Sequence, residues 1–425
     1  MQSSDPVLND LFSYIATSPS PFHAVAAAAE RLEAVGFTQL DEAERWTEPA
    51  GRHFVKRSGA LIAWVRSDAA GPGTPVRLVG AHTDSPNLRI KPNPDTGRAG
   101  YRQLGVEVYG GPLLNSWLDR DLGISGRVFV GSGTSTEQQL VQINSPVARV
   151  AQLAIHLDRE VNDGLKLDRQ QHLAPIWGLG APTDGDLVAE VAQTIGTSPE
   201  EISGFDLMLH DLTVPASLGI DATMYAAPRI DNLASCHAAV IGLIDSGAED
   251  GFSMICLFDH EEVGSGSATG ADGAMLAHVL ERIELGCGGD RESLLRSTTG
   301  SWCVSADGAH AVHPNYLDRY EPDHHVVLNG GPVIKTNTNE RYATAADGVA
   351  MFRSVCETVG VATQVYSHRT NLACGSTIGP LTAANLGIRT IDVGSAQLSM
   401  HSARELGGSE DPALLTAALG AFLAT

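Results

Sequence analysis

Residues 254–262 have the sequence MICLFDHEE, in which five apolar residues are followed at once by four titratable ones. A short, continuous apolar run is typical of a strand that is buried on both faces of a sheet. In an open α/β sheet, ligands collect outside the carboxyl ends of the strands. The stretch therefore predicts an α/β fold, with chemistry performed around Glu261 and Glu262.

Three further apolar runs lead to a histidine or an aspartate in the same way. They are Val76–Ala81 before His82, Trp302–Val304 before Asp307, and Ile388–Val393 before His401. Asp231 stands in front of a helix-like stretch. Because strand ends of such a sheet share one edge, we expect these side chains to meet in one site. The candidate metal ligands are His82, Asp231, Glu262, Asp307 and His401.

Each of these segments, taken alone, has a plainer explanation. Residues two apart on a strand face the same side, so Asp84 could orient His82, but a lone His-x-Asp pair is a weak sign of a metal site. The acidic stretch after Phe258 could be a solvated turn. Asp231 could simply cap the helix that follows it.

The set as a whole favours a binuclear metal centre. With Asp231 shared, the five ligands offer each of two ions three protein contacts, which leaves the open position of a catalytic zinc site. Two such ions polarise a carbonyl and activate water together, and Glu261 is the candidate general base. Mixed histidine and carboxylate ligands favour zinc, and they also suit cobalt or manganese.

Composition limits the partners and the location. A chain of 425 residues exceeds one compact core, so we expect two domains. The net charge of −22 argues against nucleic acid or an anionic membrane as a partner, and it requires a local cationic pocket for any acidic substrate. The six cysteines contain no C-x-x-C pair, which favours buried, reduced thiols. Met1–Asp10 lacks the features of a signal peptide, so we expect a cytoplasmic protein.

The order of local patterns predicts an interrupted domain. A helix capped by Ser20 is expected up to Val35, with strands at 53–56 and 61–65. From Pro92 the chain is punctuated by Pro and Gly, with alternating strands at 126–130 and 139–143, a helix at 146–161, and a capping box at 198–201. Surface loops are expected at 131–136 and 286–290. We therefore predict one discontinuous α/β domain, residues 1–92 and 228–425, with a central mixed sheet flanked by helices, and a β-rich insert at 93–227.

In several of its sequence segments the chain resembles the aspartyl aminopeptidases, which are dinuclear metallopeptidases that remove N-terminal Asp or Glu from peptides. The resemblance runs nearly end to end. It is carried by SPSPFHAV (18–25), AHTDSP (81–86), WLDRDL (117–122), RIDNL (229–233), DHEEVGS (259–265), SADGAHAVHPNY (305–316), GPVIK (331–335) and CGSTIGP (374–380).

The resemblance implies a role for each matching residue. One ion would bind His82, Asp231 and Asp307, and the other would bind Asp231, Glu262 and His401. Glu261 would be the base and Asp84 would orient His82. Lys335 and Tyr342 would contact the substrate, and His156 would reach the active site of a neighbouring subunit. Related dinuclear peptidases also have a cis peptide after the bridging aspartate, which predicts one at Asp231–Asn232.

The resemblance further implies a dimerisation role for the insert and a tetrahedral dodecamer. The chain departs from the family at Asn371, where the family usually has Asp, and this removes a negative charge near the site. An aminopeptidase acting on N-terminal Asp or Glu is the function we expect. The alternatives are an aminopeptidase or deacylase of other specificity, and an inactive scaffold or cargo shell. The scaffold is disfavoured because no ligand or base is missing.

Overall fold

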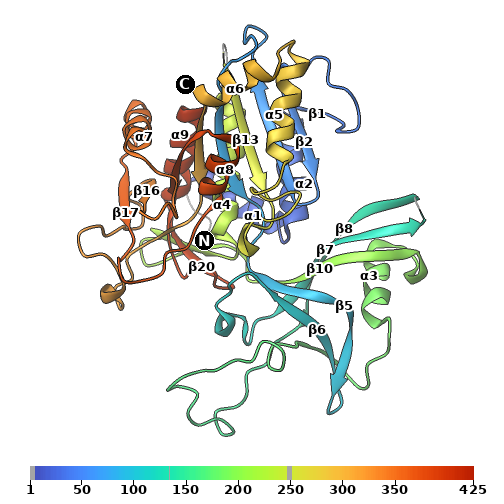
Figure 1. Cartoon of the computed structure of the whole chain (residues 1–425). Helices are drawn as coiled ribbons and strands as arrows, with labels where there is room; N and C mark the ends of the chain where they lie inside the picture. The colour runs from blue at the N-terminus through green and yellow to red at the C-terminus, as the bar shows by residue number, and fades with distance from the viewer. Residues whose placement is uncertain (1–4, 134, 247–250) are drawn as a thin grey trace. The chain divides into compact units, whose positions relative to one another are not determined.

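A computed structural model describes residues 5–133, 135–246 and 251–425. The chain divides into two compact units. The first contains Met1–Asp84, Pro215–Met400 and Glu405–Thr425, and the second contains Ser85–Val214 and His401–Arg404. In Figure 1 the second unit has the cyan and green colours of the middle of the chain.

The first unit is built on a mixed sheet of nine strands within the described ranges. Their order is β1 (Thr38–Gln39), β2 (Gly51–Arg57), β3 (Ala60–Arg66), β13 (Phe252–Phe258), β4 (Arg77–His82), β14 (Trp302–Ala306), β18 (Arg389–Gly394), β16 (Val333–Thr336) and β17 (Gln364–Ser367). Strands β13, β4, β14 and β18 are parallel neighbours. Their carboxyl ends therefore lie along one edge, which is where the candidate ligands follow them.

Helices cover both faces of this sheet (Figure 1). One face packs with α1 (Pro6–Thr17), α2 (Pro21–Ala34), α4 (Ile230–Ser246), α7 (Ala346–Thr358) and α9 (Asp411–Leu423). The other packs with α5 (Met275–Gly286) and α8 (Ile378–Leu386), and α6 (Arg291–Gly300) lies against α5. Along β13, Ile255 belongs to the first core and Met254 to the second, and all seven residues are buried. The predicted doubly buried strand and α/β fold are confirmed.

A smaller sheet completes the first unit. Its order is β11 (Ala216–Leu218), β12 (Met224–Ala227), β20 (Glu405–Gly408), β19 (Ala396–Leu398) and β15 (Ala309–His310). Short 3-10 turns lie at η3 (Glu261–Val263) and η4 (Leu317–Arg319).

The second unit is an antiparallel sheet with one α-helix among its described residues. The strand order is β8 (Ser135–Ala148), β7 (Leu122–Ser132), β10 (Ile202–Asp211), β5 (Asn87–Arg98), β6 (Tyr101–Tyr109) and β9 (Ile176–Leu179). The helix is α3 (Asp186–Ile195), and 3-10 turns occur at η1 (Leu114–Trp117) and η2 (Pro199–Glu201). The strands expected at 126–130 and 139–143 pair with each other in β7 and β8.

The boundaries of the insert differ from the expected 93 and 227. The second unit begins at Ser85, because β5 already pairs with β6 and β10 from Asn87 onwards. It ends at Val214, because β11 and β12 pair with each other and β12 pairs with β20 of the first unit. The Pro and Gly residues after Pro92 mark the middle of a strand and its bulge, not the start of a domain.

The helix expected at 146–161 is wrong. Pro146 lies in β8, an edge strand, where a missing N–H is tolerated, and the chain then runs through coil and turns. The apolar residues Leu153, Ile155 and Leu157 are spaced by two and are exposed, so they form no helical stripe. The capping box at 198–201 is present, but it caps the single turn η2, because the alternating residues that follow pair with β7.

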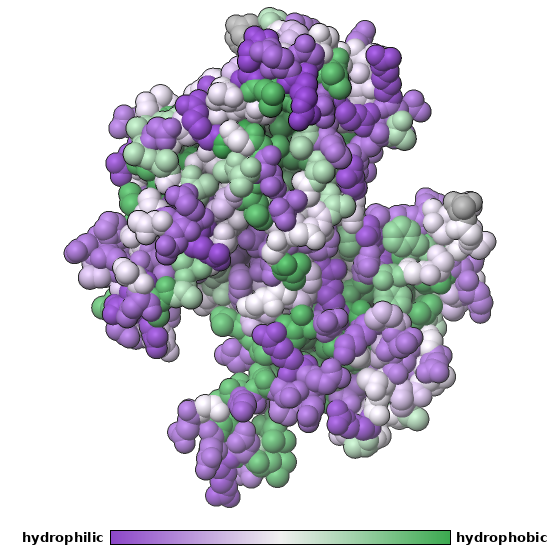
Figure 2. Space-filling view, viewed as in Figure 1, coloured by the Kyte–Doolittle hydropathy of each residue, from purple (hydrophilic) through white to green (hydrophobic). Residues whose placement is uncertain are grey.

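The loop expected at 131–136 is mostly strand, because Gly131 pairs with Thr136 and Ser132 with Ser135. Several other local expectations hold for the described residues. Ser20 caps α2, accepting a hydrogen bond from the His23 N–H at 3.4 Å. All six cysteines are free thiols. The N-terminal stretch and the loop at 131–136 include Met1–Ser4 and residue 134, which lie outside the described residues. In the described part of the chain, no helix is both long and apolar enough to cross a membrane. Figure 2 shows a surface rich in hydrophilic side chains, in keeping with the net charge.

Asp411 is a buried carboxyl in the first turn of α9. It is 2% exposed, and its Oδ2 accepts a hydrogen bond from the Asn329 N–H at 2.9 Å. Burial raises the pKa of Asp411 to about 7, whereas an unfolded aspartate titrates near about 3.9. The folded chain therefore holds this proton more tightly. The stability that the group contributes is greatest below about pH 4 and is lost as the pH rises towards 7.

Asp411→Asn keeps an acceptor but cannot ionise. We predict that it is more stable than wild type at pH 8, on the order of 2 kcal/mol. Urea unfolding at pH 8 and pH 5 measures the difference, which should shrink at the lower pH. A variant that is less stable at both pH values would contradict this account.

Candidate metal centre

Three predicted ligands meet at the end of β4. The Nε2 atom of His82 lies 3.4 Å from Oδ1 of Asp231 and 3.5 Å from Oδ1 of Asp307. All three side chains are buried, and their donor atoms lie within 4.8 Å of one another. One imidazole nitrogen and two carboxylate oxygens in this arrangement are a donor set that zinc accepts.

The acidic stretch after β13 forms a second donor group with the same histidine. Glu261 and Glu262 lie in η3, and each offers an oxygen within 4.8 Å of a nitrogen of His82. Asp84 holds this turn in place, because its two carboxylate oxygens accept the N–H groups of Glu261 and Glu262 at 3.1 Å each. A buried carboxylate therefore joins the end of β4 to the end of β13.

Asp84 also contacts His82 directly. The Nδ1 of His82 lies 3.0 Å from the carbonyl oxygen of Asp84 and 3.4 Å from its Oδ1. A proton on Nδ1 that donates to Asp84 leaves Nε2 to face Asp231 and Asp307. This is the geometry that the expected orienting role of Asp84 requires.

Asp231 is positioned by two contacts from other elements. Its N–H donates to Oε2 of Glu405 at 2.9 Å, and the side chain of Asn232 donates to the carbonyl oxygen of Ala306 at 2.8 Å. The second contact ties the start of α4 to the strand end that precedes Asp307. The Asp231–Asn232 peptide bond is cis, as predicted.

The charges at this edge fit bound cations. Burial is the main cause that raises the pKa of Glu261 to about 8; the nearby His82 lowers this pKa, and the carboxylates of Asp307, Asp231 and Asp84 raise it. Burial acts to lower the pKa of His82, yet its hydrogen bonds to Asp231, Asp307 and Asp84 raise it well above the usual value. Buried carboxylates outnumber the cations beside them, so divalent metal would relieve their repulsion.

The two predicted substrate residues lie beside this group of carboxylates. Lys335 is 2% exposed, and its Nζ lies 3.4 Å from Oδ2 of Asp307, 3.2 Å from the Asp307 carbonyl oxygen and 3.1 Å from that of Gly308. The ring of Tyr342 is centred 5.1 Å from the same ammonium. Lys335 thus contacts the predicted metal ligand Asp307.

Two predicted residues belong to the second unit. The Nδ1 of His401 lies 3.0 Å from the carbonyl oxygen of Gly111, and a proton donated there makes Nε2 the metal-binding nitrogen. His156 is exposed in the turn segment after β8. Both roles stay predictions.

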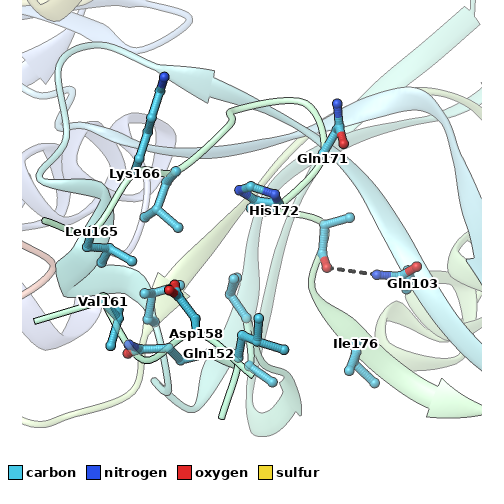
Figure 3. Close-up of a pocket in the computed structure, with 15 residues that line it drawn as sticks. Gln103, Gln152, Asp158, Val161, Leu165, Lys166, Gln171, His172 and Ile176 are labelled. Atoms are coloured by element: carbon cyan, nitrogen blue, oxygen red, sulfur yellow. Dashed lines mark hydrogen bonds between the residues drawn. The ribbon is translucent and has the colours of Figure 1, made fainter. Parts of the chain in front are cut away.

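Figure 3 shows a pocket of this unit with a volume of about 330 Å³. It is lined by Asp158 and Val161 of the same turn segment and by Gln103, which donates to the carbonyl oxygen of Ala174 at 3.1 Å. None of the predicted site residues lines it.

Sequence reasoning missed three residues that support the site, two buried carboxylates and a half-buried histidine. Glu405 holds Asp231, as described above. Asp392 accepts hydrogen bonds from the Thr377 hydroxyl and the Ala343 N–H at 2.6 Å each. Burial, together with the nearby Lys335, lowers the pKa of His310 to about 4, so a neutral imidazole stands near Asp307. Asp392 had a detectable signal, a carboxylate between the apolar residues Ile391 and Val393.

The α/β fold and a carboxylate–histidine centre at its strand ends are those of a metal-dependent hydrolase. Residues 14–423 match the family described as Aminopeptidase I zinc metalloprotease (M18). The chain is 52% identical to a probable M18 family aminopeptidase 2 of Streptomyces avermitilis, over 98% of this chain and 97% of the relative. It is 49% identical to the protein of the same description in Mycobacterium tuberculosis, over 97% of each chain.

Solved structures agree with this result. A chain from the complex of Ape4 and Nbr1 has a TM-score of 0.94 and 36% identity, over 98% of this chain and 85% of that chain. The mApe1 dodecamer of S. cerevisiae has a TM-score of 0.87 and 29% identity, over 98% and 96%. This chain belongs to the M18 family of zinc metalloproteases, and it is an aminopeptidase.

Gly394, at the end of β18, leaves no room for a side chain beside Asp307. A Cβ at this position would lie 1.5 Å from the carbonyl oxygen of Asp307. We predict that Gly394→Ala displaces this ligand, loses zinc, and destabilises the fold by about 1–3 kcal/mol. Zinc content by elemental analysis and thermal unfolding measure both effects. Gly71→Ala is the control, because its Cβ would meet nothing within 4 Å, and retention of full zinc by Gly394→Ala would contradict the prediction.

Proposed function

We propose that this protein is an aspartyl aminopeptidase, which removes N-terminal Asp or Glu from peptides at a binuclear metal centre. The observation that carries the proposal is the convergence of His82, Asp231 and Asp307 beside Glu261 and Glu262. His82, Asp231 and Asp307 would hold one ion. Asp231, Glu262 and His401 would hold the other. Zinc is the proposed metal at both positions, with cobalt or manganese as the alternative at one of them.

The residues of the chain divide the work of peptide hydrolysis. The bound ions would polarise the scissile carbonyl and lower the pKa of the attacking water. Glu261 accepts the proton of this water and returns it to the leaving amine. Its high pKa in the absence of cations, about 8, reflects a buried carboxylate that holds a proton readily. Asp84 fixes the position of Glu261 and Glu262 by accepting hydrogen bonds from both of their N–H groups.

Preference for an acidic N-terminal residue rests on the buried positive charge of Lys335. In a chain of net charge −22, this ammonium lies beside a proposed metal ligand and under the ring of Tyr342. A carboxylate on the first substrate residue would be attracted to this charge, and Tyr342 would shape the space around it.

We also propose that the second unit is a dimerisation domain and that the protein assembles as a tetrahedral dodecamer. The support is that its M18 neighbour mApe1 is a dodecamer. In this arrangement His156 would donate to the tetrahedral intermediate in the active site of a neighbouring subunit. Its exposure in a segment with exposed Leu153, Ile155 and Leu157 fits a surface that another subunit covers.

Steady-state kinetics on Asp-, Glu-, Ala- and Leu-amide substrates, with and without a chelator, test the function. We expect activity on the acidic substrates to exceed that on the others by at least about tenfold, the effect of one charge-assisted contact. A chelator should abolish it, and zinc should restore it. Equal rates on all four substrates would reject the acidic specificity, and activity that survives metal removal would reject the metal mechanism.

Replacing the base gives a sharper test of the chemistry. Glu261→Gln removes the proton acceptor but no proposed ligand, so turnover should fall by about 10²–10⁴-fold while metal content is unchanged. Kinetics and elemental analysis on the same preparation decide the outcome. Near-wild-type turnover would show that another group takes the proton.

A mixed oligomer tests the contribution of His156 across subunits. His156→Ala and Glu261→Gln should each be nearly inactive alone. When the two chains are co-expressed, an intact Glu261 on one chain meets an intact His156 on the other, and activity should reappear. Mixed oligomers that stay as inactive as their parents would mean that His156 acts within its own chain or has no role.

A further inference from the structure

A second cationic pocket lies next to the proposed substrate residues, within the first unit. Strands β16 and β17 run parallel and end at Thr336 and Ser367. A pocket with a volume of about 590 Å³ lies at these ends, and its lining includes Thr336, Ser367, Arg341, Arg369, His368 and Glu340. The carboxyl ends of parallel strands are where α/β sheets bind ligands.

The two guanidinium groups of this pocket donate to neutral acceptors. Arg369 donates from Nε to Oδ1 of Asn371 at 2.9 Å and from Nη1 to the carbonyl oxygen of Tyr320 at 3.2 Å. Arg341 donates from Nε to the carbonyl oxygen of Gly375 at 3.3 Å. Among the residues that the structure describes, neither arginine makes an ion pair. Their charge is therefore opposed within the lining only by Glu340.

Exposed arginines are often simply solvated, so the presence of two arginines alone does not indicate a binding site. Here both arginines line one pocket, and each is held by hydrogen bonds that use only part of its guanidinium group. Within the described residues, the other N–H groups of the two guanidinium groups donate to no acceptor. A guanidinium fork of this kind binds a carboxylate through two parallel hydrogen bonds.

A row of contacts connects this pocket to the metal centre. The Nζ of Lys335 lies 3.4 Å from Asp307 and 5.1 Å from the ring centre of Tyr342. The Tyr342 and Tyr366 rings are 6.5 Å apart, and the Tyr366 hydroxyl lies 2.7 Å from Nδ1 of His368. Lys335 and Tyr342 thus stand between the ligand Asp307 and the pocket. The pocket therefore neighbours the position proposed for the N-terminal side chain.

We infer that Arg341 and Arg369 form a subsite for a second carboxylate of the peptide, supplied by an acidic residue that follows the N-terminal one. The inference rests on the proposed function and extends it from the first residue to the next. Lys335 attracts the acidic side chain that is removed with the N-terminal residue. The arginines bind the acidic side chain that remains on the product.

Asn371 keeps this subsite cationic. Its neutral amide oxygen accepts from Arg369 without cancelling the guanidinium charge. Asn371→Asp has the same shape and would place a carboxylate 2.9 Å from Nε of Arg369, which would pair with the guanidinium in place of substrate. This single change therefore separates the charge of the pocket from its shape.

The test compares Asp-Glu-amide with Asp-Gln-amide as substrates of the zinc-loaded enzyme. We expect the wild-type kcat/KM for the acidic second residue to be higher by about tenfold, mainly through KM, as one charge-assisted hydrogen bond predicts. Arg341→Gln, Arg369→Gln and Asn371→Asp should each bring this ratio towards one. Arg296→Gln, on the exposed surface of α6, is the matched control and should keep the ratio.

Comparison of Asp-Gln-amide with Ala-Gln-amide measures the preference at the first residue separately from the preference at the second. If wild type prefers an acidic first residue but is indifferent to the second, the subsite is rejected and the proposed function stands. If wild type has no preference at the first residue, the proposed function fails in its specificity. A ratio that survives in all three pocket variants also rejects the subsite. If a glutamine variant fails to fold, Asn371→Asp, which changes only charge, still decides.

Discussion

The structure depends on keeping several buried carboxylates together at the carboxyl ends of the parallel strands of a mixed sheet. Asp84 is fully buried, and Asp231 and Asp307 are 4% and 8% exposed. Like charges at short range in a poorly solvated site repel strongly, so such a group exists only where hydrogen bonds and cations oppose the repulsion. Backbone N–H groups, His82 and Lys335 supply part of this compensation. A zinc aminopeptidase completes it with metal, and the same excess of negative charge is what gives the metal its affinity.

The positions of these carboxylates are set by contacts between strand ends. Asp84 ties β4 to β13 by binding the N–H groups of Glu261 and Glu262, and Asn232 ties α4 to the end of β14. The side chain of Asp307 contacts Lys335, and its carbonyl oxygen fills the space that a side chain at position 394 would need. These residues lie where several strands and a helix end. Each of those elements is held in place by one or both of the buried cores that flank the sheet. Packing of the two cores against the sheet thus controls the geometry of the chemistry.

At the substrate site the electrostatic requirement is the opposite one, since a negative group must be attracted. A chain with net charge −22 must attract acidic peptides. In our proposal, a few cations lie where the acidic groups of the substrate would bind. Lys335 is buried beside Asp307, and Arg341 and Arg369 are held by neutral acceptors. The resemblance leads one to expect Asp at position 371. The neutral side chain of Asn371 instead leaves the positive charge of Arg369 available to a substrate.

The sequence by itself determined the fold class, the family and the candidate ligands. Apolar runs such as Met254–Phe258 and the titratable residues that follow them are local signals, and their meaning does not depend on distant contacts. The helix expected at 146–161 is wrong because an edge strand tolerates Pro146 and because Leu153, Ile155 and Leu157 are exposed and form no helical stripe. The limits of the second unit were missed because strand pairing, which is long-range, defines them. Only the tertiary structure revealed that Asp84 bridges two strand ends, that Glu405 and Asp392 are buried supports, and that Lys335 contacts Asp307. These partners are far apart in sequence, and no local pattern records which residues the fold brings together.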